Sequence, residues 1–193
     1  MTGRPPWTPP QPDRPSAGRL GLRGLPRVVL HRLSLPRWPL APLRIAVLSD
    51  LHVCVPWVPP EAVRAVVAQV NTLGADLILF GGDLLADRNL PAARPEAHDL
   101  VPLLDPLAAP LGVFAAMGNH DWKDCSRSRA TGGRENSVVD AFGASPVALI
   151  RNGAVRIDHA GAAFWLAVTD SAGPKLPGGR KFDRARAFAG EAA

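Results

Sequence analysis

Three short apolar runs, each ending in a cluster of polar residues, constrain the fold of this chain more than any other feature. The runs cover residues 43–48, 77–80 and 113–117, and their length and aliphatic composition are typical of strands buried on both faces. Between the first two runs, apolar residues at positions 63, 66, 67 and 70 follow the period of an α-helix. Strands that alternate with helices are typical of a parallel sheet, so the sequence predicts an α/β fold.

Prolines set the limits of the predicted helices. Pro60 lies near the first turn of the helix over residues 61–70, where its missing amide donor costs nothing. Residues 96–109 also predict a helix, but Pro102 and Pro106 must kink or break it. We therefore expect one regular and one interrupted helix between the strands.

The last third of the chain has a different pattern. Residues 136–143 predict a short helix, and residues 147–150 predict a further strand. Asn152-Gly153 is a strong signal for a two-residue hairpin turn because both residue types tolerate positive φ, and residues 154–157 would form the returning strand. With another strand over residues 163–168, we expect an antiparallel unit appended to the parallel sheet.

Polar groups directly follow each of the three predicted parallel strands. The candidate site residues are Asp50, His52, Asp83, Asn119, His120 and Asp121. Because ligands gather outside the carboxyl ends of the strands in an open α/β sheet, these side chains are expected to meet at one edge. Carboxylate and amide oxygens together with imidazole nitrogens suit divalent cations such as Mn, Fe or Zn. Two cations held roughly 3.5–4 Å apart clamp a phosphoryl group, so the pattern predicts a metal site for phosphoryl chemistry.

Other cysteines and histidines are weaker candidates for metal ligands. Cys54 and Cys125 lie close in sequence to the polar clusters, and a thiolate can bind Zn or Fe, but a buried, inert thiol is the commoner state. His159 lies in an expected strand-end turn, His98 in the interrupted helix and His31 in the N-terminal segment. We expect all three histidines to lie outside the site.

The basic charge of the chain comes from its N-terminal segment. The formal net charge is +5 and the pI is about 10.2, yet residues 1–44 hold eight arginines and one acid, and the remaining 14 bases and 16 acids carry −2. Ten of the 21 prolines lie in the first 42 residues, which excludes a long helix or a central strand there. We expect residues 1–43 to form a basic, proline-rich arm, disordered or polyproline-like up to about residue 25, and residues 44–193 to form the domain.

This charge distribution limits the classes of partner. A slightly acidic domain argues against nucleic-acid binding, whereas the arm suits an anionic membrane surface, at about 1 kcal/mol per arginine. The sequence has no apolar run of about 18 residues and no signal-peptide stretch at its N-terminus. We expect a cytoplasmic protein that contacts the inner membrane face peripherally through residues 1–43; the oligomeric state is not indicated.

The three polar clusters resemble the signature blocks of a known family. Ser49-Asp50-Leu51-His52, Phe80-Gly81-Gly82-Asp83 and Met117-Gly118-Asn119-His120-Asp121 are similar to the first three blocks of the calcineurin-like metallophosphoesterases. Within that family, the chain resembles the small bacterial branch of UDP-2,3-diacylglucosamine pyrophosphatases and YaeI/YkuE-like phosphodiesterases. The resemblance implies a four-layer αββα sandwich with a dinuclear metal centre.

The same resemblance implies a role for each candidate residue. The implied metal ligands are Asp50 and His52 for the first ion, Asp83 as the bridge, and Asn119 for the second ion. His120 would contact the phosphate and protonate the leaving oxygen, and Asp121 would hold His120 in place.

The chain departs from the family pattern in its last part. The family completes its site with a later histidine and a Gly-His-x-His block, and this chain contains neither. The resemblance therefore implies a C-terminally truncated sandwich with an incomplete second metal site, so we expect weak or absent hydrolysis by this chain. Two hypotheses about function remain. The first is a metal-dependent phosphoesterase that hydrolyses a phosphodiester or pyrophosphate in a lipid-linked or nucleotide substrate. The second is a catalytically impaired homologue or a binding module that uses its basic arm.

Overall fold

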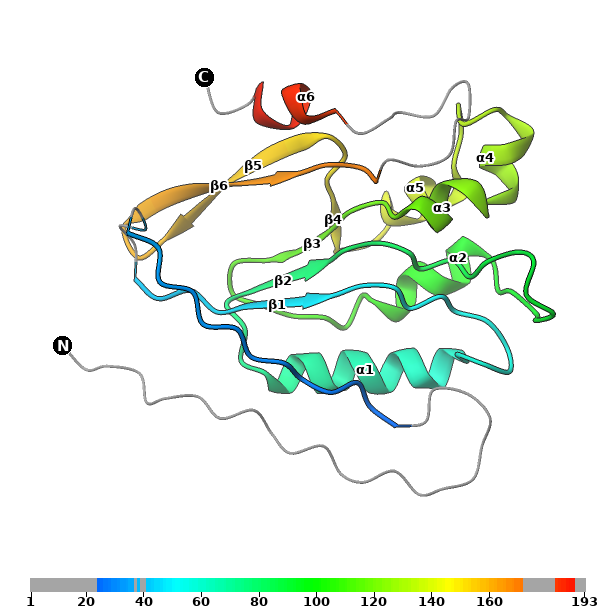
Figure 1. The fold of residues 1–193 in the computed structure, drawn as a ribbon, viewed down its shortest axis with the longest axis horizontal. Helices are drawn as coiled ribbons and strands as arrows, with labels where there is room; N and C mark the ends of the chain where they lie inside the picture. The colour runs from blue at the N-terminus through cyan, green and yellow to red at the C-terminus, as the bar shows by residue number, and fades with distance from the viewer. Residues whose placement is uncertain (1–23, 37, 39–40, 172–182, 190–193) are drawn as a thin grey trace.

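A four-stranded parallel sheet forms the centre of the computed structural model, which describes residues 24–36, 38, 41–171 and 183–189 (Figure 1). The strands are β1 (Ile45–Leu48), β2 (Leu77–Phe80), β3 (Val113–Ala115) and β4 (Ala148–Leu149), in that spatial order. Every neighbouring pair is parallel, with Ile45 opposite Leu77 and Ile78 opposite Val113. The sheet confirms the predicted α/β fold class, and its parallel direction brings the ends of β1, β2 and β3 to one edge.

Helix α1 (Pro60–Thr72) covers one face of this sheet (Figure 1). Pro60 stands at its first turn, as predicted, and the valines that follow the helical period are the buried ones. After Leu73, the chain turns at Gly74, whose φ of +57° is accessible to glycine without steric cost. The sequence pattern therefore located this element correctly.

The other helices are short. They are α2 (Ala97–Leu100), the 3-10 turn η1 (Val101–Leu103), α3 (Asn119–Lys123), α4 (Ser126–Ala130), α5 (Ser137–Phe142) and α6 (Arg184–Phe188). The interruption expected in residues 96–109 occurs where α2 passes into η1 at Pro102. Helices α3 and α4 were not predicted, because five residues are too few to develop an apolar period.

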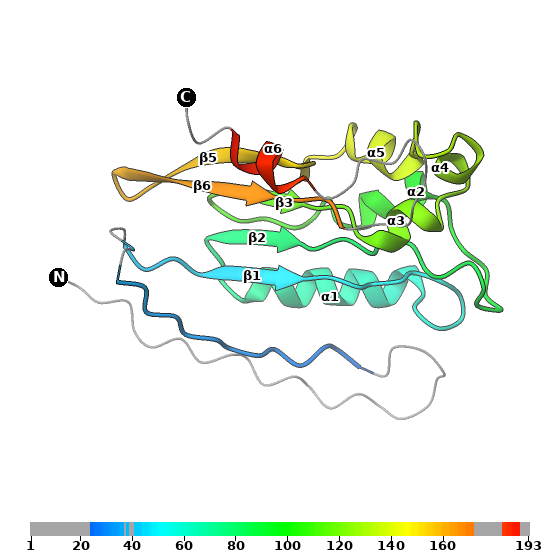
Figure 2. The ribbon, with the colours of Figure 1, turned by 45° about the horizontal axis from the view of Figure 1, so that its top comes forward.

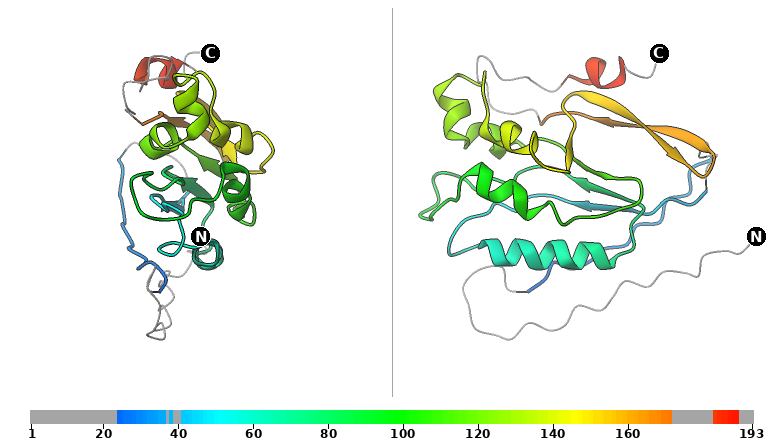
Figure 3. Two further views of the ribbon diagram at one scale, coloured as in Figure 1. Left: turned by 90° about the vertical axis from the view of Figure 1, so that its right-hand side faces the viewer. Right: turned by 180° about the vertical axis from the view of Figure 1, so that it is seen from behind.

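A second sheet consists of β5 (Gly153–His159) and β6 (Ala162–Val168), paired antiparallel. It lies on the side of the parallel sheet opposite α1, and α6 lies over its outer face (Figures 1 and 3). The order α1, parallel sheet, hairpin, α6 gives the predicted succession of four layers. Figure 2 shows the hairpin over the β3 side of the parallel sheet.

The hairpin turn lies at a different place from the one predicted. Ala160 and Gly161 form the two-residue turn, with φ of 51° and 82°, between the paired residues His159 and Ala162. Asn152 does have positive φ, 44°, but it marks the passage from one sheet to the other. The prediction of a hairpin at Asn152-Gly153 was wrong because the preceding strand, β4, pairs with β3 in parallel.

The core lies between the parallel sheet and its helices. Buried side chains of α1, β2, η1 and α5 form one cluster, which includes Val63, Phe80, Val101, Val138 and Phe142. On β1 the burial alternates: Ala46 is buried, whereas Ile45 and Val47 on the other face are 44% and 70% exposed. The prediction of a strand buried on both faces was therefore wrong for β1, which the core covers from one side only among the described residues.

The described part of the N-terminal arm is extended. Residues 24–36 contain no helix or strand, and the chain is fixed to α1 where the Gln69 side-chain amide donates a hydrogen bond to the carbonyl of Pro26 (3.0 Å). Farther along, the ring of Trp38 packs against Phe164 of β6. The prediction of disorder up to about residue 25 falls mostly on residues outside the described part. Within the residues that the structure describes, no helix has the length and apolar character needed to cross a membrane.

Candidate metal centre

The predicted site residues lie at the carboxyl edge of the parallel sheet. Asp50 and His52 follow β1, and Asp83 follows β2. The loops stay paired beyond the strands: the amide of Asp50 donates to the carbonyl of Gly82 and the amide of His52 donates to the carbonyl of Asp83, both at 3.0 Å. This continued pairing positions the first two clusters relative to each other through backbone, without relying on side chains.

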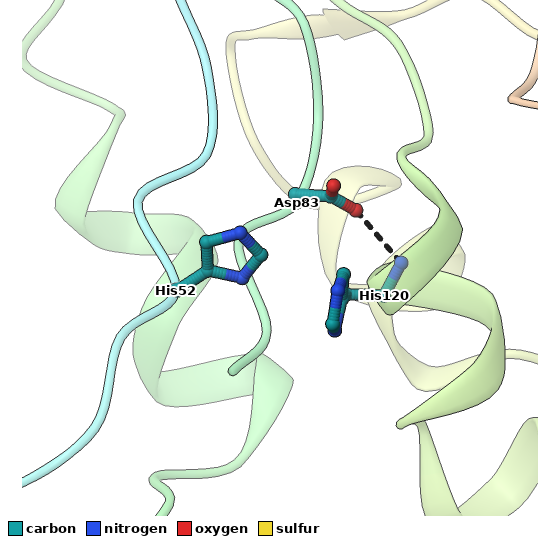
Figure 4. A group of neighbouring side chains, drawn as sticks. All are labelled: His52, Asp83 and His120. Atoms are coloured by element: carbon teal, nitrogen blue, oxygen red, sulfur yellow. Dashed lines mark hydrogen bonds between the residues drawn. The ribbon is translucent and has the colours of Figure 1, made fainter. Parts of the chain in front are cut away.

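The third cluster opens helix α3, directly after β3. Asn119 is the first residue of α3 and His120 the second. The amide of His120 donates a hydrogen bond of 2.7 Å to Oδ1 of Asp83, which is the contact drawn in Figure 4. The start of α3 is therefore tied to the loop after β2, and one oxygen of Asp83 remains for another ligand.

Three side chains from the three strand ends converge. Each of His52, Asp83 and His120 offers a ligand atom, and these atoms lie within 4.8 Å of one another (Figure 4). The rings of His52 and His120 are edge to face with centroids 4.6 Å apart. Asp83 is buried and the two histidines are partly buried. Two imidazoles and a shielded carboxylate form a donor set that suits a divalent transition metal ion.

The orientation of His52 is set by the backbone. Its Nδ1 lies 3.0 Å from the carbonyl oxygen of Leu85. Because a carbonyl only accepts, Nδ1 carries the proton and Nε2 keeps its lone pair, which is the state of a metal-binding imidazole. Nε2 also lies 3.6 Å from Oδ1 of Asp50, whose other oxygen accepts a hydrogen bond from the hydroxyl of Ser49.

Backbone strain is concentrated at these residues. Five non-glycine residues of the described chain have positive φ, and three of them are Asp50 (58°), His52 (46°) and Asp83 (59°). Left-handed backbone costs a residue with a side chain about 1–2 kcal/mol, and such strain persists where the surrounding structure enforces it, typically at functional sites. This strain is a second, independent sign that the loops are shaped for a ligand.

Two glycines allow the loops after β2 and β3 to touch. A Cβ added to Gly82 would lie 2.1 Å from the amide nitrogen of Gly118, and one added to Gly118 would lie 2.1 Å from Oδ1 of Asp83. Any side chain at either position would push Asp83 away from His120. Glycine is therefore a geometric requirement of this site.

Asp121 has a different role from the predicted one. Its buried carboxylate accepts hydrogen bonds from the amides of Asp83, Leu84, Leu85 and Gly118, at 2.8–3.1 Å. Burial raises the pKa of Asp121 to about 6, against the opposing effect of these amides. Asp121 thus fixes the loop after β2 to the loop after β3.

The residue that holds His120 is Asp124, which sequence reasoning missed. Nδ1 of His120 lies 2.7 Å from Oδ2 of Asp124. The spacing of four residues brings two side chains together on a helix, so the signal was available only if α3 had been predicted. The expected contact between Asp121 and His120 is replaced by this one.

The remaining candidates do not join the cluster. Cys54 and Cys125 are buried free thiols, and in the part of the chain that is described neither belongs to a group of potential metal ligands. Cys125 instead accepts from the amide of Ser128. His98 is 76% exposed on α2, and His159 ends β5 beside the hairpin turn.

Comparison with known proteins agrees with the geometry. The chain is similar to the UDP-2,3-diacylglucosamine pyrophosphatase LpxG of Chlamydia muridarum, with 33% identity over 98 residues, which is 51% of this chain and 28% of the relative. The corresponding protein of Chlamydia trachomatis is 34% identical over 80 residues, or 42% of this chain and 23% of the relative. The chain thus spans only about a quarter of the length of these relatives. No solved structure matches it significantly.

The family assignment rests on a longer match. The sequence model described as calcineurin-like phosphoesterase matches residues 43–180, which include all three polar clusters and both sheets. The family implies divalent metal ions, and the cluster of His52, Asp83 and His120 fits such ions in its donor types and spacing. The chain belongs to the calcineurin-like phosphoesterase family.

Proposed function

We propose that this chain carries the site of a metal-dependent phosphoesterase that hydrolyses a phosphodiester or a pyrophosphate. The observation that carries the proposal is the convergence of His52, Asp83 and His120 at the edge of the sheet, where an atom of each lies within 4.8 Å of the others. Two proposed metal ligands, His52 and Asp83, thus lie next to an imidazole that can act as the acid. Family membership supports the same chemistry. Divalent ions in such a site polarise a phosphoryl oxygen and lower the pKa of a water molecule.

The protein's own groups divide into ligands and a proton donor. Asp50 and His52 would hold one ion, Asp83 would reach two, and Asn119 would contribute its amide oxygen to the second. With Asp83 and Asn119 as the two ligands that the family pattern assigns to it among the described residues, the second site is expected to bind its ion more weakly than the first. His120 would donate a proton to the leaving oxygen, since a protonated imidazole is an effective acid near neutral pH.

The substrate proposal rests on the relatives. Both similar proteins are named as UDP-2,3-diacylglucosamine pyrophosphatases, which supports a pyrophosphate within a lipid-linked nucleotide as the substrate class. The basic arm supports the same setting, because arginines attract an anionic membrane surface. The alternative is a homologue that binds the metal or the membrane without hydrolysis.

The test is Mn²⁺ titration by calorimetry, combined with hydrolysis of bis(4-nitrophenyl) phosphate and of a UDP-sugar. We expect Mn²⁺ binding that Asp83→Asn abolishes, because this substitution removes the central carboxylate, together with slow turnover. The matched control is Asp99→Asn, which removes an exposed carboxylate on α2 and should leave both unchanged. Equal Mn²⁺ binding by the wild type and Asp83→Asn would refute the site, whereas binding without turnover would favour the non-catalytic alternative.

A further inference from the structure

We propose that Asp124 is a positioning residue for His120, holding its ring in the tautomer that the reaction needs. Asp124 ends helix α3 and its side chain is 2% exposed, whereas the side chain of His120, one turn earlier, is 16% exposed. A buried carboxylate is costly to desolvate, so it persists only with strong partners. The structure provides two, one on each oxygen.

The first partner is the imidazole. Oδ2 of Asp124 lies 2.7 Å from Nδ1 of His120, a distance typical of a charge-assisted hydrogen bond. Because an ionised carboxylate only accepts, Nδ1 must carry the proton, and Nε2 is left with the lone pair in the neutral ring. When the ring is protonated, the same contact leaves Nε2 as the nitrogen with the transferable proton.

The second partner fixes the carboxylate itself. The amide of Arg88 donates to Oδ1 of Asp124 at 3.2 Å, and the guanidinium Nε of Arg88 lies 3.9 Å from the same atom. With Oδ1 engaged by the loop after β2, Oδ2 is directed to the imidazole. The Asp124 carboxylate is thus held in place by the loop after β2, whereas the imidazole that it orients belongs to α3.

The competing explanation is that Asp124 only connects the loop after β2 with α3, and the chain offers a matched control for it. Asp87 also connects the loop after β2 with α3, since its Oδ2 lies 3.9 Å from Nζ of Lys123 and its Oδ1 accepts from the amide of Asn89. No hydrogen bond or ion pair joins Asp87 to His120 among the described residues. Asp87 interacts with His120 only through space, by its charge, so Asp87→Asn changes the same connection while leaving the hydrogen bond at Nδ1 of the ring in place.

The experiment is two-bond ¹H–¹⁵N NMR of the ¹⁵N-histidine-labelled chain at a pH where its imidazoles are neutral, with His120 assigned by its loss in His120→Asn. We expect the Nδ1–H tautomer in the wild type and in Asp87→Asn. In Asp124→Asn, the side-chain oxygen can still accept from the amide of Arg88, so the side-chain NH₂ faces the ring. Because an NH₂ donates, Nδ1 must accept, and His120 should shift to the Nε2–H tautomer. Asp124→Ala provides a second variant, in which the preference for Nδ1–H should also be lost, and thermal melting checks that each variant is folded.

Two results would overturn the proposal: an unchanged tautomer in folded Asp124→Asn or Asp124→Ala, or an equal change in Asp87→Asn. The catalytic consequence rests on the proposed function. With turnover, Asp124→Asn should lower kcat about 10–100-fold for an alkyl phosphodiester and less for the 4-nitrophenyl ester, whose leaving group needs little protonation. A reversed tautomer in a chain that hydrolyses neither ester would support the positioning of His120 and refute the hydrolase function alone.

Discussion

Replacing Gly118 with alanine is the sharpest test of how the three loops form the site. The new Cβ would lie 2.1 Å from Oδ1 of Asp83, 2.3 Å from its amide nitrogen and 2.5 Å from its Cγ. Cβ contacts shorter than 3.0 Å essentially never occur, so the loop after β2 or the start of α3 must move by about 1 Å to restore ordinary contact distances. That movement would also stretch the bond from the His120 amide to Asp83, 2.7 Å in the native site.

Overpacking a well-packed contact should lower the free energy of unfolding by about 1–3 kcal/mol. Hydrogen bonds that break would lower it further. For a chain of this size, each kcal/mol lowers Tm by about 2–4 °C. The matched control is Gly153→Ala, where the nearest atoms lie at 3.7 Å and the change should be within about 0.5 kcal/mol. Gly118→Ala should also weaken Mn²⁺ binding, because Asp83 is displaced from the two histidines.

Thermal and urea unfolding of the metal-free proteins measure the first effect, and calorimetric titration measures the second. Equal Tm values for the Gly118 and Gly153 variants, with equal Mn²⁺ affinity, would show that the loops accommodate a methyl group freely. The close approach of Gly118 to Asp83 would then not determine the geometry of the site.

Three further predictions address other parts of the molecule. Asp121→Ala removes the acceptor of four backbone amides, three of them in buried hydrogen bonds, and should lower the free energy of unfolding in urea by more than about 3 kcal/mol. Asp121→Asn, which keeps one carbonyl oxygen, should cost less, and equal costs would contradict this role of Asp121. Asn152→Ala places alanine at a positive φ and removes an oxygen that accepts from the amides of Asp170 and Asp183. It should lower the free energy of unfolding by about 2 kcal/mol. Asn152→Gly should recover the share of this loss that comes from the positive φ. Deleting residues 1–43 should remove salt-sensitive binding to anionic vesicles, and unchanged sedimentation with the vesicles would exclude an electrostatic role of the arm.

The close approach of Gly82 and Gly118 could not be predicted from the sequence. A glycine beside a strand end permits a close approach of some other group, but only the structure shows that these two glycines pack on each other. The partner of a glycine is set by the register between β2 and β3, with Phe80 opposite Ala115. No property of either loop alone specifies that register.

The strand β4 illustrates the same limit at the level of topology. Residues 147–150 predict a strand and Asn152 adopts the expected positive φ, yet the strand pairs with β3 and the hairpin forms later, at Ala160-Gly161. Turn propensity describes the local backbone, whereas the choice of partner depends on which edge is available. That edge exists only after β3 has joined the sheet.

The sequence by itself determined which segments become the strands β1, β2 and β3, where α1 begins, and that acidic and imidazole groups follow three strands in succession. These are properties of apolar period, proline geometry and chain order, all of which act within a few residues. Only the tertiary structure decided that Asp121 fastens the loops while Asp124 orients His120. Both carboxylates lie within four residues of His120 in the sequence. The direction of each depends on how α3 packs against the loop after β2, and that contact joins residues more than 30 positions apart.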